Sequence, residues 1–212
     1  MHRRLFGLAA LFCTLAAASP AHAAPLNLTL ISTPDIFAEF IAVNYNSITD
    51  QLSASGVASD IKLAPSLVVD ITNGSGGFGS FVLNATIDGN GNAIAGSLSI
   101  AGQIQTSPLV PSGVLLTGNL IGFGFRTQGG GPLEFRFSVT GGSAASSFGT
   151  TIGTILSQNG FTGSFNQNFH ANSGLSDTAP IPEPGSALLL LLAGVPIVAQ
   201  KLRRLGVHAS SE

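Results

Sequence analysis

Residues 133–140 read Leu-Glu-Phe-Arg-Phe-Ser-Val-Thr, so apolar and polar side chains alternate there without a break. Successive side chains of a β-strand point to opposite faces of its sheet. The four apolar side chains therefore share one face and the four polar ones share the other. Such strict alternation is typical of a half-buried antiparallel strand. The stretch predicts a protein built from strands with one face on a core and one face in water.

Similar apolar runs recur along the chain and predict further strands. They lie at residues 26–31, 36–42, 67–72, 81–87, 98–104 and 115–125. In the last run, Gly122 and Gly124 predict either a kink or a strand that is buried on both faces. Only residues 35–43 and 146–158 allow a short helix. Many strands with glycine-rich turns, and no alternation of strands with helices, predict an all-β fold: an antiparallel β-sandwich or a related meander.

The segment from Asp88 to Asn92 reads Asp-Gly-Asn-Gly-Asn and separates two of the alternating runs. Glycine and asparagine accept positive φ, so the segment predicts a hairpin turn. It also begins like a calcium loop, with oxygen ligands at alternate positions. Ala93 then stands where the turn glycine of such a loop belongs, and Ser99 where its bidentate glutamate belongs. A plain turn is the favoured interpretation, and we expect no metal.

Residues 24–176 are predicted to form one exported all-β domain. Its charged residues are few, and acids outnumber bases. Between residues 24 and 181 the cations are Lys62, Arg126 and Arg136, and the acids are Asp35, Glu39, Asp50, Asp60, Asp70, Asp88, Glu134 and Asp177. Nucleic-acid binding demands clustered Lys and Arg, so no nucleic acid is expected as a partner. The only cysteine, Cys13, precedes the domain, so no disulfide can stabilise it.

Residue types that carry catalysis are scarce in this domain. His170 is its only histidine, and the polar residues around it, Asn168 and Asn172, favour a surface position. There is no nucleophile elbow, no metal-binding pair of histidines or cysteines and no phosphate-binding loop. Two carboxylates that meet in space remain the one enzymatic alternative. The absence of tryptophan, with Tyr45 as the only tyrosine, weakens a sugar-stacking site. We expect no enzyme and no cofactor.

The first 23 residues have the features of a secretory signal peptide. Arg3 and Arg4 give a positive start, residues 5–18 are apolar, and Ala21 and Ala23 form an A-x-A cleavage site. Signal peptidase is expected to cut after Ala23.

The C-terminal residues have a different, three-part order. Pro182-Glu183-Pro184 precedes an uncharged apolar segment of about residues 185–200, and the cations Lys201, Arg203 and Arg204 follow it. The segment predicts a hydrophobic helix that is short for a membrane span, although the cations extend its reach by snorkelling. The alternative is a buried core helix. Because both hydrophobic segments carry their cations on the terminal side, both ends are predicted to be cytoplasmic and everything between them translocated.

This tail, residues 177–212, resembles the PEP-CTERM sorting signal of exported Gram-negative proteins. The resemblance implies recognition by exosortase, a membrane-embedded cysteine protease, and cleavage near the Pro182-Glu183-Pro184 motif. It also implies an inner-membrane intermediate, delivery to the cell surface or extracellular matrix, and a link to exopolysaccharide or biofilm. It implies nothing about an activity of the delivered domain.

Three functions therefore stay open at this point. The first is a non-catalytic surface or matrix protein linked to exopolysaccharide. The second is a binding module for a glycan or a protein, which a concave patch with Asn, Asp and exposed Phe side chains would favour. The third is a hydrolase with two carboxylates about 5 to 10 Å apart in a cleft.

Overall fold

The structure, a computed structural model, describes residues 24–105 and 112–182, and it is all-β as predicted. The one short helix of the described residues is α1 (Ala145–Phe148). The strands are β1 (Asp35–Asn46), β2 (Gln51–Ala64), β3 (Leu67–Thr72), β4 (Ser80–Ile87), β5 (Ala93–Ile104), β6 (Ser112–Gly124), β7 (Leu133–Gly141), β8 (Thr151–Ser157) and β9 (Phe169–Pro180).

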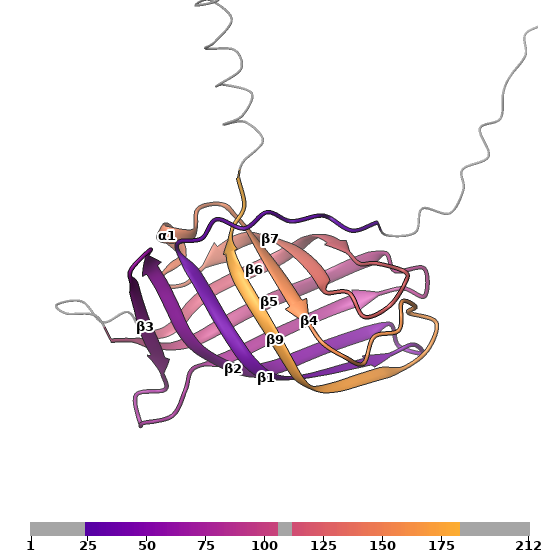
Figure 1. The fold of residues 1–212 in the computed structure, drawn as a ribbon, viewed down its shortest axis with the longest axis horizontal. Helices are drawn as coiled ribbons and strands as arrows, with labels where there is room; N and C mark the ends of the chain where they lie inside the picture. The colour runs from indigo at the N-terminus through magenta and orange to yellow at the C-terminus, as the bar shows by residue number, and fades with distance from the viewer. Residues whose placement is uncertain (1–23, 106–111, 183–212) are drawn as a thin grey trace, which may run out of the picture.

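The sheet closes on itself, because β1 pairs with both β2 and β9. Eight antiparallel strands form the closed barrel, and β4 to β9 follow one another around it as a meander (Figure 1). The ninth strand, β3, pairs with β2 and β5 beyond the end of β4. Of the two predicted architectures the meander is confirmed, and the β-sandwich is wrong. The pairing of the first strand with the last leaves one curved sheet where a sandwich would have two.

The inward side chains form one hydrophobic core, and the alternation in the sequence identifies many of them. Leu133, Phe135 and Phe137 of β7 are fully buried. In β4, Phe81 and Leu83 are buried in the same way. Burying a side chain of this size contributes about 1.5 to 3 kcal/mol. The inward faces of these strands therefore supply much of the driving force for closing the barrel.

Residues 24–31, which we call the N-terminal strap, do not form the strand predicted at 26–31. The strap crosses the outside of the barrel over β6 to β9, as the indigo segment in Figure 1 shows. The carboxylate of Glu134 on β7 accepts the backbone N–H groups of Asn27 (2.9 Å) and Leu28 (3.3 Å). At Gly153 an added Cβ would lie 2.7 Å from the Leu30 side chain, so glycine lets the strap approach the wall. The strap covers the outer end of Glu134, which explains the burial of that side chain.

Other predicted boundaries also change. Residues 35–43 belong to β1, so the helix allowed there is wrong. Within 146–158, only a fragment of α1 is helical, and β8 takes most of the rest. The predicted domain boundary at residue 176 falls inside β9, which continues to Pro180. Residues 177–180 are therefore part of the barrel wall.

No helix in the described part of the chain is long and apolar enough to span a membrane. The predicted signal peptide (residues 1–23), the apolar segment at 185–200 and the cations Lys201, Arg203 and Arg204 lie outside the described residues.

Candidate functional site: an uncharged hollow beside β1

A shallow hollow of about 650 Å³ lies beside the turn that joins β1 to β2. We call it the amide hollow. Its lining residues are Asn44, Tyr45, Asn46, Thr49, Gln51, Ser53, Asn168, Phe169 and His170. None of these described residues is Lys, Arg, Asp or Glu. The hollow therefore offers hydrogen-bonding groups without a fixed charge.

Hydrogen bonds within the protein hold the rim of the hollow in place. The Oδ1 atom of Asn168 accepts both the backbone N–H (2.8 Å) and the hydroxyl (2.9 Å) of Ser47. The Oδ1 atom of Asn46 accepts the N–H groups of Ile48 and Thr49. The Asn168 bonds join the loop before β9 to the β1–β2 turn, and the Asn46 bonds lie within that turn. The rim is thus preorganised before any ligand arrives, which lowers the entropic cost of binding.

The floor of the hollow rests on a buried aromatic cluster. The Tyr45 ring stacks on Phe169 at a centroid distance of 5.3 Å and meets Phe165 edge-on at 4.9 Å. The Tyr45 hydroxyl donates to the carbonyl of Ile87 at 2.7 Å. Burial, followed by the negative charge of Asp50, raises the pKa of Tyr45 to about 12. Tyr45 therefore stays a neutral hydrogen-bond donor, and its role is to fix the floor.

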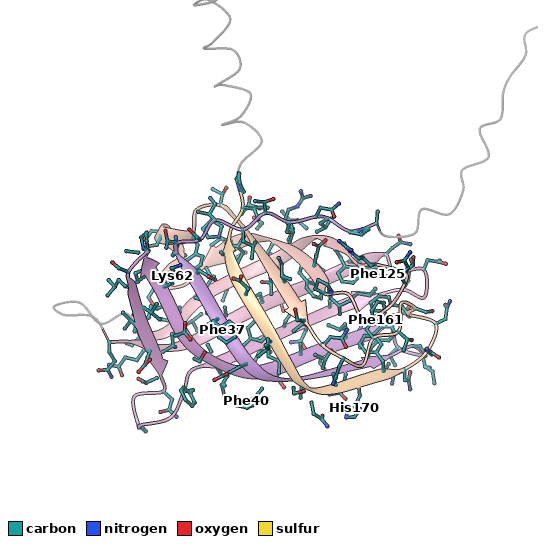
Figure 2. The ribbon with its side chains drawn as sticks, in the orientation of Figure 1. Phe37, Phe40, Lys62, Phe125, Phe161 and His170 are labelled. Carbon is teal, nitrogen blue, oxygen red and sulfur yellow. The ribbon has the colours of Figure 1, made fainter. Side chains whose placement is uncertain are left out.

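Two side chains stand free over this floor. Asn44 on β1 and His170 on β9 pair across the two strands, and both side chains are exposed. Within the described part of the chain, neither side chain has a hydrogen-bond partner. Figure 2 places His170 on the outside of the barrel, which confirms the predicted surface position. These two groups are available to a ligand.

Phe40, four residues before Asn44 in β1, is unusual in two ways. Its side chain is 68% exposed, and its φ of +51° lies in the left-handed region that bulky residues rarely adopt. It occupies a β-bulge, because the pairing of β1 shifts there against both β2 and β9. Figure 2 shows Phe40 at the outer edge of the barrel. The sequence pattern does not distinguish Phe40, because the residue continues the apolar run at 36–42.

The structure also brings two carboxyl groups together, Asp35 on β1 and Asp177 on β9. Burial raises the pKa of Asp35 to about 8, as do a hydrogen bond and the negative charge of Asp177, whereas Lys62 lowers it. The two carboxyl groups share one hydrogen bond, whereas the carboxylates of glycosidases stand about 5 to 10 Å apart. Neither acid lines the amide hollow. This pair lacks the spacing that the hydrolase alternative predicted.

The segment from Asp88 to Asn92 forms the predicted hairpin turn between β4 and β5. Asp88 Oδ1 accepts the N–H groups of Asn90 and Asn92 at 2.9 and 2.8 Å, and Oδ2 accepts the Asn92 side chain. Although partial burial acts to raise the pKa of Asp88, these bonds, those from Asn92 above all, lower it. The carboxylate that would begin a calcium loop is thus used within the turn. The described residues hold no group of three or more side chains suited to a metal ion.

The predicted processing residues flank the strands of the barrel in the sequence. The strap starts at Ala24, directly after the predicted signal-peptidase site at Ala21 and Ala23. Pro182 is exposed two residues after the end of β9, and Glu183 and Pro184 lie outside the described residues. Comparison of the chain with models of known protein families, with curated proteins and with solved structures found no match.

Proposed function

We propose that this chain is an exported, non-catalytic protein of the cell surface or extracellular matrix, and that its barrel associates with neutral exopolysaccharide. The observation that carries the proposal is a row of uncharged polar side chains on the outer wall. Successive pairings connect its members across six neighbouring strands. They are His170, Asn44, Ser53, Asn84, Ser97 and Asn119.

The chemistry of this row suits a hydroxyl-rich polymer. Amides and hydroxyls both donate and accept hydrogen bonds, as sugar hydroxyls do. One such bond contributes only about 0.5 to 1.5 kcal/mol net, so an extended row is needed for useful affinity. The strands β4, β5 and β6 contain no charged residue, so this part of the wall offers no attraction to a polyanion. A neutral glycan is the polymer that such a wall favours.

The export half of the proposal is supported by the two ends of the sequence. The first 23 residues have the features of a signal peptide, and at the other end the Pro182-Glu183-Pro184 motif, an apolar segment and a basic cluster are arranged as in the PEP-CTERM sorting signal. Cleavage after Ala23 and near Pro182 would leave every strand of the barrel intact, because the first strand starts at Asp35 and the last ends at Pro180. The partners proposed on this basis are signal peptidase, an exosortase-type protease and, transiently, the inner membrane.

The test is mass spectrometry of both ends of the protein in membrane, surface and extracellular fractions. We expect an N-terminus at Ala24 and a C-terminus near Pro182 in the outer fractions. The variant Glu183→Ala should keep the N-terminal cut and lose the C-terminal one. An intact chain through Glu212 that stays in the inner membrane would overturn the export proposal. Normal loss of the tail from the Glu183→Ala variant would remove the sorting motif from it.

A further inference from the structure

We infer that Phe40 and the amide hollow form one binding site, in which a neutral glycan chain lies along the outside of β1 with a sugar ring against Phe40. The inference rests on the proposed association with polysaccharide and assigns it to particular residues. It combines two independent observations on the same strand. One is the preorganised, uncharged hollow around Asn44, and the other is the strained, exposed aromatic side chain of Phe40.

The two parts face the same side of the wall. Ile41, Val43 and Tyr45 of β1 are buried in the core, and the residues between them point outward. Phe40 and Asn44 are four residues apart, about 13 Å at the rise of an extended strand. Ala42 lies between them, and its small side chain leaves room above the strand. We call this row, Phe40 to Asn46, the β1 track.

Polar groups flank the β1 track on both sides. Across from Ala42, Asn44 and Asn46, β2 places the side chains of Ser55, Ser53 and Gln51. On the other side, β9 places His170 beside Asn44. A bound glycan therefore meets hydroxyl and amide groups at its edges and an aromatic ring at one end. Orienting polar groups around an apolar contact is the usual composition of a small-molecule site.

Phe40 is an extra residue of β1 relative to its partner strand β2. Glu39 pairs with Val57 and Ala42 with Ser55, so two residues of β1, Phe40 and Ile41, stand opposite one residue of β2. Without Phe40, the inward and outward alternation of β1 would continue unbroken through Ile41. Bulges re-aim side chains and are frequent beside functional sites. Left-handed backbone at a bulky residue marks stored strain of the kind that clusters at ligand sites. The bulge places the aromatic ring of Phe40 outside the core, where its side chain is mostly exposed.

The charges around the β1 track favour a neutral ligand. Glu39 precedes Phe40 at one end, and Asp50 follows the track at the other, in the β1–β2 turn. Asp50 lies 3.5 Å from the Tyr45 hydroxyl that supports the floor. Like charges at the two ends of a site repel an anionic polymer. The inferred ligand is therefore an uncharged glycan.

The test compares variants of the β1 track with matched control variants elsewhere on the barrel. Phe40→Ala is paired with Ile121→Ala, which also removes an exposed apolar side chain. Asn44→Ala is paired with Gln128→Ala, which also removes an exposed amide but lies in the turn after β6, outside the polar row. Binding is measured on the full-length chain in mild detergent, with dextran, galactomannan and hydroxyethylcellulose as neutral probes and alginate as the anionic probe. Phe40→Tyr keeps the ring and should keep binding, which separates loss of the ring from loss of the fold.

We expect each track variant to weaken binding of a neutral probe about tenfold, the effect of one good contact, and each control variant by less than about twofold. Wild-type protein that binds no neutral probe would overturn both the proposed function and this inference. Wild-type binding with unchanged affinity in Phe40→Ala and Asn44→Ala would overturn the inference alone. Equal losses in the track and control variants would also overturn it. Preference for alginate would exclude the neutral ligand.

Discussion

The strap side of the barrel and its β1–β9 face differ in how they accommodate carboxyl groups on the outer wall. The strap side supplies hydrogen-bond donors to its carboxylate, and the β1–β9 face supplies few donors and also holds a strained residue. On the strap side, both oxygens of the Glu134 carboxylate accept backbone N–H groups. On the β1–β9 face, one buried oxygen of Asp35 and one of Asp177 receive no donor from other described residues, so the two carboxyl groups depend on the hydrogen bond between them. The same face holds Phe40 with its positive φ. Burial alone therefore does not decide whether a carboxyl group stabilises this wall, because the available donors decide it.

The difference teaches where this barrel gives up stability. Natural chains break local rules chiefly at functional sites and compensate elsewhere. Here the strap side supplies donors to its buried carboxylate. The β1–β9 face instead buries two carboxyl groups against each other and holds a bulky residue, Phe40, at positive φ. The amide hollow opens on that same face. We therefore expect loss of the Glu134 hydrogen bonds to cost stability, replacement of Asp35 to raise stability at high pH, and loss of Phe40 to raise stability while it removes a ligand contact.

The largest expected effect is at Glu134. Glu134→Ala removes two hydrogen bonds to a carboxylate and leaves the N–H groups of Asn27 and Leu28 unpaired. The free energy of unfolding should therefore fall by about 2 to 4 kcal/mol. Urea unfolding followed by circular dichroism measures this difference. Glu134→Gln keeps one acceptor and should give an intermediate value. Glu39→Ala, at a half-buried acid of β1, is the matched control and should change stability by less than about 0.5 kcal/mol. A Glu134→Ala variant as stable as wild type would mean that the strap contributes nothing.

The second-largest expected effect is a pH dependence of the free energy of unfolding that Asp35 causes. Its pKa is about 8 in the folded protein against 3.8 ordinarily, so between these values the folded state binds a proton that the unfolded state has lost. The sign follows from linkage: the stabilisation is fully present below about pH 4 and is lost as the pH rises through 8. Asp35→Asn keeps a hydrogen-bond donor toward Asp177 at every pH. The variant should therefore be the more stable protein at pH 9 and match wild type at pH 4.

Thermal unfolding between pH 4 and 9 makes this comparison, with Asp70→Asn on β3, two strands from β1, as the control for removal of an acid. Parallel curves for Asp35→Asn and wild type would contradict the assignment. The charges that face the pair, Lys62 and Asp60 on β2, are unchanged in both proteins. A difference between the curves therefore reports on Asp35 itself.

The strands that the sequence predicts well are those with large inward side chains. In β4 and β7, Phe and Leu alternate with polar residues, so the period is visible. In β2 the inward set includes Ala54 and Ala58, and in β9 it includes Ala171 and Thr178. Small and polar inward residues carry no clear alternation, so neither strand was predicted. Ala54, Ala58 and Ala171 nevertheless belong to the same hydrophobic core as the Phe side chains of other strands.

Closure of the barrel and the position of the strap depend on contacts between distant residues. The pairing of β1 with β9 joins residues more than 120 positions apart, such as Tyr45 and Phe169, and no local pattern encodes it. The strap alternates Leu26, Leu28 and Leu30 with polar residues, as a wall strand would. It lies outside because β6 to β9 already have both neighbours, so only their outer surface is left. Of the residues that line the amide hollow, the sequence identified His170 with its neighbour Asn168 as surface residues and Tyr45 as the only tyrosine, but not their meeting, because polar residues from separate strands come together there through register.

The smallest expected effect on stability is at Phe40, and its sign separates a functional residue from a structural one. Phe40→Gly removes the steric cost of the left-handed backbone at this bulge, which is about 1 to 2 kcal/mol, and offsets part of it with the backbone entropy of glycine, about 0.5 to 1 kcal/mol. The side chain is mostly exposed, so little burial is lost. The net change should be a stabilisation of up to about 1 kcal/mol, measured by urea unfolding.

Deletion of Phe40 extends the same comparison. Because the residue is an insertion into an otherwise regular strand, the shortened chain should keep Ala38, Ile41 and Val43 in the core and unfold cooperatively at or above the wild-type urea concentration. Deletion of Ala42, two positions along, is the matched control. It brings Val43 next to Ile41, and the adjacent bulge could restore the alternation only by turning Phe40 into the core and Ile41 out of it, so this deletion should destabilise the barrel strongly. If both deletions destabilise equally, Phe40 serves the fold. If only the Ala42 deletion does so, the barrel gains nothing from Phe40, and a ligand remains the reason for its strained and exposed position.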